Sequence, residues 1–326
     1  MLNKRYKNDG KNLEILNELQ IQAKKDIEGK IKNKTYTFET IICPVCNNAY
    51  KFMILAKKDR YGLECTTVIC KKCGLLITNP RMTQLSYNEF YDKEYRKLYS
   101  ASEISTDNFF NEQYSHGLSI CNFIKSHLKL DDFNNKYIVE IGCGAGGILK
   151  AFRDEGANVQ GFDLGKYYLN YGKEKYNLLL NYGSIHDSDF NKSPDIIIYS
   201  HVFEHILDLE KELLKIRQIS NENTIIYIEV PGVLNIHNAY GDFLLYLQNA
   251  HTYHFSLKSL NNLFSNYGFG LVKGDEYVMA IFKQDKTRQD KIRQDTFLYY
   301  KHISYLIKLE YGYYMLKNKI KKIINL

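Results

Sequence analysis

The stretch that decides the fold reads Tyr137-Ile138-Val139-Glu140-Ile141-Gly142-Cys143-Gly144-Ala145-Gly146-Gly147 and continues into Ile148-Leu149-Lys150-Ala151-Phe152. Its first five residues are mostly apolar and predict a buried strand, and its last five predict a helix. The glycines between them permit a tight strand-to-helix turn and let the backbone approach a ligand closely. The stretch therefore predicts a ligand-binding turn at the carboxyl end of a strand.

Short apolar runs alternate with helix-like segments after this turn. We expect strands at residues 137–141, 158–162, 178–180, 195–199 and 224–230, and further strands at 270–273 and 277–283. Buried parallel strands read as continuous apolar runs, and this alternation implies βαβ units with right-handed crossovers. The sequence therefore predicts an α/β domain over residues 136–285.

Two acids bear on what the turn binds. Asp163 ends the second strand, where a carboxylate can accept both hydroxyls of a ribose. A Rossmann dinucleotide fold is one reading, because its first turn offers helix N–H groups to a pyrophosphate. Glu140, inside the first strand, would repel a pyrophosphate but would organise the cationic methionine part of S-adenosylmethionine, directly or through the loop backbone.

At this point the sequence resembles the class I S-adenosylmethionine-dependent methyltransferases. Their first motif has the form acid–apolar–Gly–x–Gly–x–Gly, which residues 140–146 match in full, and the resemblance covers residues 115–285. It implies a Rossmann-like α/β fold with a mostly parallel seven-stranded sheet, S-adenosylmethionine as cofactor and S-adenosylhomocysteine as product. The residues it assigns to the cofactor are Glu140, Gly142, Cys143, Gly144, Gly146, Asp163, Leu164, Ser184, Ile185, Ser200 and His201.

Some of these assignments compete with a structural role. The family has an acid where this chain has Ser184, which puts the recognition of adenine in doubt. Cys143 also reads as a small residue that fills the loop. Glu204 and His205 follow the fourth strand and either contact the substrate or fix the loop and the start of the next helix.

Four cysteines form a second motif, Cys43-Pro44-Val45-Cys46 and Cys70-Lys71-Lys72-Cys73-Gly74. Each pair is a turn that places two thiolates on one side of a tetrahedral Zn²⁺, and four cysteine ligands close the site. We therefore expect one structural zinc, which would stabilise a module too small to fold alone. A redox dithiol is the alternative, but the pairs lack a thioredoxin-like βαβ context.

The region after the second cysteine pair resembles the zinc-ribbon methyltransferases encoded with bacterial capsule, lipopolysaccharide and deoxysugar pathways. The resembling residues run from Asn79-Pro80-Arg81 to Tyr91-Asp92-Lys93-Glu94-Tyr95. In that group the N-terminal module and tyrosine-rich helices cover the substrate cleft. The resemblance implies that Tyr91, Tyr95 and Tyr99 contact the substrate; ordinary packing is the other reading.

A histidine segment follows the fifth strand and reads Asn249-Ala250-His251-Thr252-Tyr253-His254-Phe255-Ser256, with Ser256 as the N-cap of the next helix. A sugar hydroxyl is a poor nucleophile until a base takes its proton, and neutral histidine suits that task. The resembling enzymes have a histidine base at the position of His251. We therefore predict His251 as base, His254 as a substrate contact or a structural residue, and His237 as a weaker substrate contact.

These features favour O-methylation of a hydroxyl on a nucleotide-activated sugar, for example a GDP-heptose, in capsule or surface polysaccharide biosynthesis. C-methylation of a keto-deoxysugar nucleotide is an alternative, although that group carries a further C-terminal domain and a His-Glu-His segment. A zinc-containing rRNA methyltransferase is another, but the basic residues are not interleaved with aromatic side chains. A zinc-bearing scaffold that binds the cofactor without turnover is the third.

Length, charge and cysteine content set the remaining expectations. The chain has 326 residues, a net charge of +7 and seven cysteines. It shows no secretory signal and no apolar run near the roughly 18 residues that cross a bilayer. We expect a cytoplasmic protein without a transmembrane segment or nucleic-acid partner; the oligomeric state stays open, with a dimer as one option.

The expected organisation has five parts. Residues 1–34 contain an amphipathic helix, indicated by Leu13, Ile15, Leu16, Leu19 and Ile21, that either packs on the body or remains loose. Residues 35–82 form the zinc module, with strands at 36–42, 65–69 and 75–78. Residues 83–135 form a helical linker and substrate lid, and 136–285 the cofactor domain. Residues 286–326 form a basic helical tail, opened by an imperfect repeat at 287–295, that is either solvated or in contact with a membrane surface or partner.

Overall fold

The computed structural model describes residues 1–99, 106–285 and 295–324. The chain divides into two compact units. Unit 1 comprises Met1–Ser102, Pro231–Leu263 and Ile292–Leu326, and unit 2 comprises Glu103–Val230 and Phe264–Lys291. The histidine segment therefore belongs with the N-terminal part of the chain, although the sequence analysis drew a single cofactor domain over residues 136–285.

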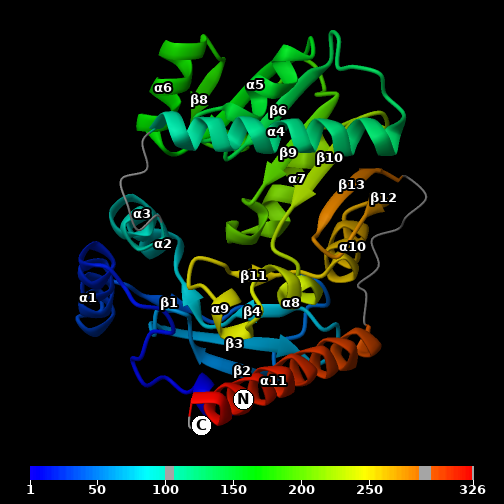
Figure 1. The fold of residues 1–326 in the computed structure, drawn as a ribbon. Helices are drawn as coiled ribbons and strands as arrows, with labels where there is room; N and C mark the ends of the chain where they lie inside the picture. The colour runs from blue at the N-terminus through cyan, green and yellow to red at the C-terminus, as the bar shows by residue number, and fades with distance from the viewer. Residues whose placement is uncertain (100–105, 286–294, 325–326) are drawn as a thin grey trace. The chain divides into compact units, whose positions relative to one another are not determined.

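Unit 2 is built on a seven-stranded sheet in the order β12-β13-β10-β9-β6-β7-β8 (Figure 1). All neighbouring pairs are parallel except those that β13 makes with β10 and β12. This arrangement confirms the predicted Rossmann-like, mostly parallel sheet. The strands are β6 (Tyr137–Ile141), β7 (Asn158–Asp163), β8 (Leu180–Tyr182), β9 (Ile196–Ser200), β10 (Ile225–Glu229), β12 (Phe269–Gly274) and β13 (Met279–Gln284).

Helices cover both faces of this sheet. Helices α4 (Thr106–Leu128) and α5 (Gly147–Asp154) share one hydrophobic core with side chains such as Ile138 and Ile198. On the other face Tyr199 donates a hydrogen bond to Glu212 of α7 (Leu209–Ile219), 2.5 Å away. The remaining elements of the unit are α6 (Lys166–Tyr176) and the 3-10 helices η3 (Ile185–Asp187) and η4 (Phe203–His205).

Unit 1 contains a four-stranded sheet in the order β11-β4-β3-β2. Its strands are β2 (Phe52–Lys58), β3 (Glu64–Cys70), β4 (Leu76–Thr78) and β11 (Tyr253–His254), and a two-stranded pair joins β1 (Phe38–Glu39) to β5 (Arg81–Met82). The predictions for β3 and β4 are confirmed. The strand expected at residues 36–42 shrinks to β1, and neither β2 nor β11 was predicted.

The helices of unit 1 are mostly short. They are the 3-10 helix η1 (Lys4–Tyr6), α1 (Glu18–Lys32), α2 (Gln84–Phe90), the π-helical turn η2 (Tyr91–Tyr95), α3 (Arg96–Tyr99), the 3-10 helix η5 (Val233–Asn235), α8 (Ile236–Ala239), α9 (Phe243–Tyr246) and α11 (Thr296–Ile324). Helix α10 (Leu257–Asn266) begins in this unit, and Ser256 Oγ accepts the N–H of Ser259 at 3.3 Å, as expected of its N-cap. Among the described residues, no helix has the length and apolar content needed to span a membrane.

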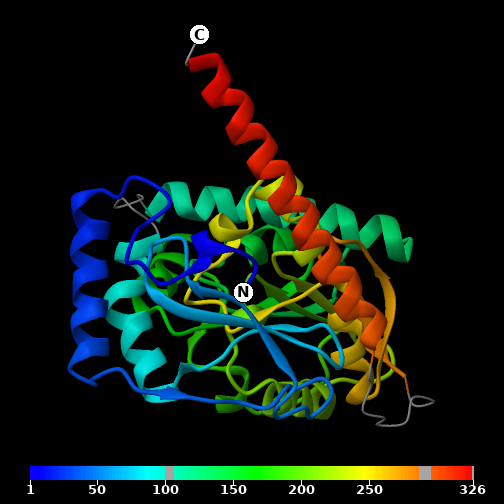
Figure 2. The ribbon, with the colours of Figure 1, turned by 90° about the horizontal axis from the view of Figure 1, so that it is seen from below.

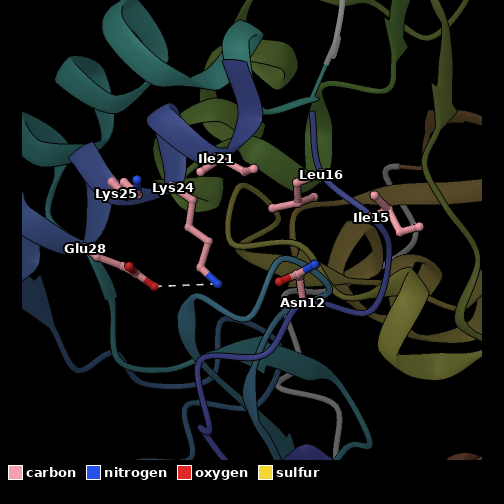
Figure 3. Close-up of a pocket in the computed structure, with 7 residues that line it drawn as sticks. All are labelled: Asn12, Ile15, Leu16, Ile21, Lys24, Lys25 and Glu28. Carbon is pink, nitrogen blue, oxygen red and sulfur yellow. Dashed lines mark ion pairs between the residues drawn. The ribbon is translucent and has the colours of Figure 1, made fainter. Parts of the chain in front are cut away.

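The first long helix starts later than the sequence predicted. Asn17 and Gln20 form a capping box that begins α1 at Glu18, and the buried residues of the helix are Ala23 and Ile27. The apolar residues that predicted the helix are instead largely exposed; Ile15 is 100% exposed. Several of them line a surface pocket beside α1 (Figure 3), together with the Lys24–Glu28 ion pair. Leu19 and Ile21 therefore lie in the expected helix, whereas Leu13, Ile15 and Leu16 precede it.

The C-terminal helix α11 runs across unit 1 (Figure 2). Leu298, His302 and Leu306 are spaced four residues apart and are all buried, so one stripe of the helix packs inward. Arg5 links the two ends of the chain, since its guanidinium donates to Glu310 of α11 and to Asp242 before α9. The predicted helical tail is present, and its first half is packed rather than solvated. Most of the repeat at 287–295 lies outside the described residues.

Candidate functional site

The glycine turn between β6 and α5 is held in one conformation by its neighbours in unit 2. The N–H groups of Gly142 and Cys143 both donate to the carbonyl oxygen of Phe162 in β7, at 2.7 and 3.1 Å. Gly142 has a φ of +70°, and a Cβ there would lie 2.3 Å from Val202 Cγ2. Glycine is therefore required at this position, both for the backbone conformation and for space.

Asp163 closes the turn from the second strand. One carboxylate oxygen accepts the N–H of Gly144 at 2.8 Å, and the other accepts the N–H of Gly165 at 2.6 Å. A carboxylate has about four lone-pair positions, so two remain for the hydroxyls of a ribose. The acid that the sequence assigned to the ribose thus also fixes the glycine turn.

Glu140 is a buried carboxyl group in the middle of this arrangement. It is 1% exposed, and its Oε2 has no hydrogen-bond partner among the described residues. Burial raises the pKa of Glu140 well above its usual range, the nearby Asp163 carboxylate adds to this, and the backbone N–H of Leu149 opposes it. A buried polar atom without a partner calls for an explanation, and a cationic ligand beside the turn would supply one.

Gln113 of α4 contacts the glycine turn, and the sequence analysis did not predict this contact. Its side-chain NH₂ donates to the carbonyl oxygen of Cys143 at 3.1 Å, and its Oε1 accepts the N–H of Ala145 at 3.1 Å. Both hydrogen bonds cross more than 25 positions of sequence. The only local signal was a polar residue within the predicted amphipathic stretch 109–130, and it did not single out Gln113.

The predicted adenine-side residues differ in what they offer. Leu164 is 66% exposed directly after Asp163, which leaves an apolar surface for a flat ring. Ser184 Oγ and N–H both donate to Asp187 at 2.7 Å, so the acid missing at Ser184 is present three residues later. Ile185 is buried, and Cys143 Sγ packs against β7, where a Cβ on Gly161 would lie 2.6 Å away. The Cys143 side chain therefore fills space beneath the turn, as the structural interpretation of this residue predicted.

Polar side chains converge where β9 and β10 end. Glu229 Oε2 accepts from Ser200 Oγ at 3.1 Å and lies 2.8 Å from Nε2 of His116 on α4. His201 Nε2 lies 3.7 Å from Glu229 Oε1. Burial alone would raise the pKa of Glu229, but the imidazoles of His116 and His201 and the Tyr227 hydroxyl hold it below its usual range. The sequence analysis predicted Ser200 and His201 here but neither Glu229 nor His116.

Glu204 lies between two histidines of the same segment. Its Oε1 is 3.8 Å from His201 Nδ1 and 3.7 Å from His205 Nε2, and its side chain is 2% exposed. This arrangement fits the predicted role of fixing the loop and the start of the next helix. A substrate contact through Glu204 or His205 stays a prediction.

The four cysteines meet in unit 1. Cys43 Sγ is 3.4 Å from Cys73 Sγ, Cys46 Sγ is 3.6 Å from Cys70 Sγ, and all four sulfur atoms lie within 4.8 Å of one another. Four sulfurs at Zn–S distances near 2.3 Å in a tetrahedron are about 3.8 Å apart, so the donor set fits a zinc ion. Asn48 donates to Cys70 Sγ at 3.4 Å, which is the kind of outer contact that orients a ligand.

The histidine segment is part of the same sheet as the second cysteine pair. Strand β11 pairs antiparallel with β4, with Tyr253 opposite Ile77 and His254 opposite Leu76, and Figure 1 shows the two strands side by side. Thr78 Oγ1 donates to the carbonyl oxygen of His251 at 2.7 Å. The predicted catalytic histidine is therefore attached, through its backbone, to the zinc module.

The two histidines of this segment have different surroundings. His254 is buried, and neither ring nitrogen has a hydrogen-bond partner among the described residues. Burial lowers the pKa of His254 to about 3, so the ring is neutral near pH 7. His251 is 5% exposed, and the two ring centroids are 6.0 Å apart. His237, the weaker candidate, shares a hydrogen bond of 3.0 Å with Tyr305 of α11.

The tyrosine-rich helices pack on the histidine segment inside unit 1. Tyr87 donates to the carbonyl oxygen of Ala250 at 2.5 Å, and Tyr99 donates to Asn249. Tyr91 and Tyr95 stack on each other with ring centroids 4.3 Å apart. The structure shows how these tyrosines pack, and their predicted contact with the substrate stays a prediction.

Comparison with known proteins identifies the domain that contains the glycine turn. Residues 113–273 match the model of a family described as a methyltransferase domain. This match covers the glycine turn, Asp163 and the ends of β9 and β10. The chain therefore carries a class I S-adenosylmethionine-dependent methyltransferase domain. A search of curated proteins found no match to the chain.

Solved methyltransferase structures share parts of the fold. CalS10, an amino pentose methyltransferase from Micromonospora echinaspora, has 14% identity over 36% of this chain and 50% of its own, with a TM-score of 0.31. An S-adenosylmethionine-dependent methyltransferase from Mesorhizobium loti has 14% identity over 50% and 94%, with a TM-score of 0.40. DesVI of Streptomyces venezuelae has 13% identity over 40% and 58%, with a TM-score of 0.33. The chain thus spans half the length of the first, and at such values these likenesses assign no substrate.

Proposed function

We propose that this protein methylates a hydroxyl group of a nucleotide-activated sugar, for example a GDP-heptose, in capsule or surface polysaccharide biosynthesis. S-adenosylmethionine is the methyl donor, and His251 is the general base. His254 contacts the substrate, and one zinc ion on Cys43, Cys46, Cys70 and Cys73 supports the module that holds both histidines. Thiolate ligands favour a reducing compartment, so we propose the cytoplasm.

The observation that carries the proposal is the unsatisfied imidazole of His254, three residues after His251. Buried polar groups normally have hydrogen-bond partners, and both ring nitrogens of His254 lack one among the described residues. A ligand rich in hydroxyl groups would provide donors and acceptors at once. Because its pKa is lowered to about 3, His254 stays neutral and can both donate and accept.

The proposed chemistry needs little beyond position and one base. The sulfonium already activates the methyl group, so the protein has to hold the acceptor oxygen, the methyl carbon and the sulfur in line. As the O–C bond forms, the hydroxyl proton passes to His251, and the electrons of the S–C bond leave with the sulfur of S-adenosylhomocysteine. Glu140 supports cofactor binding, since a buried carboxylate would pair with the ammonium group of the methionine part.

The test is a turnover assay with zinc-loaded protein, S-adenosylmethionine and a panel of acceptors, read by mass for the gain of one CH₂ group. The panel contains nucleotide-activated sugars, a keto-deoxysugar nucleotide and ribosomal RNA, and NMR locates the new methyl on oxygen or carbon. His251→Ala should lose turnover and keep S-adenosylhomocysteine binding. His127→Ala, an exposed histidine on α4, is the matched control and should keep both.

Three results would contradict the proposal. Methylation of RNA with no sugar accepted would replace the substrate class. A methyl group on carbon would replace the reaction. Full activity in His251→Ala would remove that residue as the base.

A further inference from the structure

Unit 2 contains a cluster of two imidazoles and one carboxylate, of which His116 and Glu229 have no assigned role and His201 is assigned to the cofactor by resemblance alone. His116 comes from α4, His201 follows β9, and Glu229 ends β10. His116 Nε2 is 2.8 Å from Glu229 Oε2, and His201 Nε2 is 3.7 Å from Glu229 Oε1. The nearest ligand atoms of the three residues all lie within 4.8 Å of one another. Each imidazole therefore faces a different oxygen of one carboxylate.

These separations match those around a bound metal ion. Nitrogen and oxygen ligands at about 2.0–2.2 Å from a metal, with angles between 90° and 109°, are about 2.8–3.6 Å apart. The separations from Glu229, 2.8 Å for His116 and 3.7 Å for His201, lie at the lower end of that range and just above it. Small side-chain rotations would therefore bring the three atoms to a common ion.

The surroundings hold these ligands in place. Tyr227 and Ser200 both donate to Glu229 Oε2 at 3.1 Å, and the N–H of His201 donates to the carbonyl oxygen of Glu229 at 2.9 Å. Glu204 lies on the far side of the His201 ring, 3.8 Å from Nδ1. A carboxylate behind a ligating histidine fixes the ring and its tautomer in many metal sites. His201 also has a φ of +55°, a conformation that is uncommon for residues other than glycine.

We propose that His116, His201 and Glu229 bind a divalent first-row transition metal such as Co²⁺, Fe²⁺ or Zn²⁺. Imidazole nitrogens favour these ions over Mg²⁺, which prefers oxygen ligands. The site is open, because the side chains of His116 and His201 are 36% and 53% exposed, whereas the four-cysteine site is closed by its own ligands. The open positions would take two oxygen atoms of the acceptor, and this last step rests on the proposed sugar methylation.

A second His–Glu pair in the same unit provides an internal control. His186 Nε2 is 2.8 Å from Glu212 Oε2, and Tyr199 donates to the other oxygen of Glu212. The nitrogen–oxygen distance of this pair equals that of His116 and Glu229, 2.8 Å. It gains no third histidine, cysteine or acid at ligand distance among the residues described. It should therefore remain an ordinary hydrogen-bonded pair that binds no metal.

The experiment titrates Co²⁺ into the full-length, zinc-loaded protein and follows calorimetry and visible absorption. Wild type should bind one Co²⁺ per chain without the thiolate charge-transfer band that would report entry into the cysteine site. His116→Ala removes a half-exposed side chain and Glu229→Gln keeps the shape of the original, so both should fold; each should weaken binding by at least about 100-fold. His186→Ala should bind as wild type does.

Two results would overturn the site: no Co²⁺ binding by wild type, or equal binding by wild type, His116→Ala and Glu229→Gln. The turnover assay separates this outcome from failure of the proposed function. Co²⁺ binding that depends on His116 and Glu229 supports the site even where no sugar is methylated. Sugar methylation by a protein that binds no Co²⁺ overturns the site and leaves the proposed function standing.

Discussion

The glycine turn of unit 2 and the histidine strand of unit 1 differ in how far along the chain their supporting residues lie. The turn between β6 and α5 is fixed by Phe162 and Asp163, about twenty residues further along the chain, and by Gln113, about thirty residues before it. The histidine strand, which comprises His251 and β11, is fixed by β4, and the hydrogen bond from Thr78 to His251 spans 173 positions. A cofactor site made from adjacent segments can be recognised in one sequence. The support that a distant module gives to a histidine cannot be recognised in this way.

The two regions should also fail separately. The turn depends on backbone conformation and close packing, whereas the histidine strand depends on a sheet whose strand β3 ends at Cys70. The largest effect should come from removing the metal. Replacing Cys70 by Ser, or stripping zinc with a chelator, should remove a binding free energy of about 10–16 kcal/mol from unit 1. Turnover should vanish while S-adenosylhomocysteine affinity changes little, as measured by calorimetry.

Cys65→Ser is the control for the metal experiment, because Cys65 is buried in β3 but lies outside the quartet. It should keep one zinc per chain and most of the activity. If cofactor affinity falls together with zinc content, the two regions are not separable and the comparison is wrong.

The next effect tests the turn. In Gly142→Ala the new Cβ would lie 2.3 Å from Val202 Cγ2, so the turn must shift. Calorimetry should show a loss of S-adenosylhomocysteine affinity of more than about tenfold, or 1.4 kcal/mol. Gly241→Ala is the matched control, since Gly241 has a φ of +68° with nothing within 4 Å of its Cβ. It should cost about 1–2 kcal/mol of stability and leave affinity unchanged. Equal affinity losses would contradict the steric argument.

The pH dependence of stability should have opposite signs in the two units. Burial lowers the pKa of His254 to about 3 and of His302 to about 4, both below the ordinary 6.5. The unfolded chain binds more protons below pH 6.5, so unit 1 loses up to about 1.4 kcal/mol per histidine and pH unit as pH falls. Glu140 has a raised pKa, so unit 2 loses stability as pH rises above about 4.5.

Hydrogen exchange read by mass spectrometry, corrected for intrinsic rates, follows each unit separately. His302→Gln should reduce the acid-side slope of unit 1 only. Glu140→Gln should reduce the slope of unit 2 only. Slopes that neither substitution changes would refute the assignment of these buried groups.

The smallest effect tests the support of the histidine strand. Thr78→Val removes the hydroxyl that donates to the carbonyl oxygen of His251, at a cost of about 1–3 kcal/mol. We expect kcat to fall a few-fold with cofactor affinity unchanged. Thr67→Val, on the neighbouring strand, is the control because its buried hydroxyl bonds to no nitrogen or oxygen atom of the described residues. A larger loss in Thr67→Val would count against the role of Thr78.

Much of unit 2 could be predicted because its signals are local. Each of its seven strands falls on or beside an apolar run of the sequence, and Glu140, Gly142 and Asp163 lie where the motif indicated. The cluster of His116 and Glu229 could not be predicted, since α4 contributes one member from 113 positions away. The start of α1 after Ile15 could not be predicted, because an apolar pattern does not show whether a core is present to cover the apolar side chains. Strand β11 is too short to be seen, and only its pairing with β4 defines it.

The interleaving of the two units has a consequence for synthesis on the ribosome. Unit 1 contains the first hundred residues of the chain, yet its sheet lacks β11 until residue 254 has emerged, and α11 packs on it later still. At translation rates of about 5–20 residues per second, the four-cysteine end of the chain waits on the order of 10–40 s for β11 and α11. Early capture of zinc would protect its thiolates during that interval.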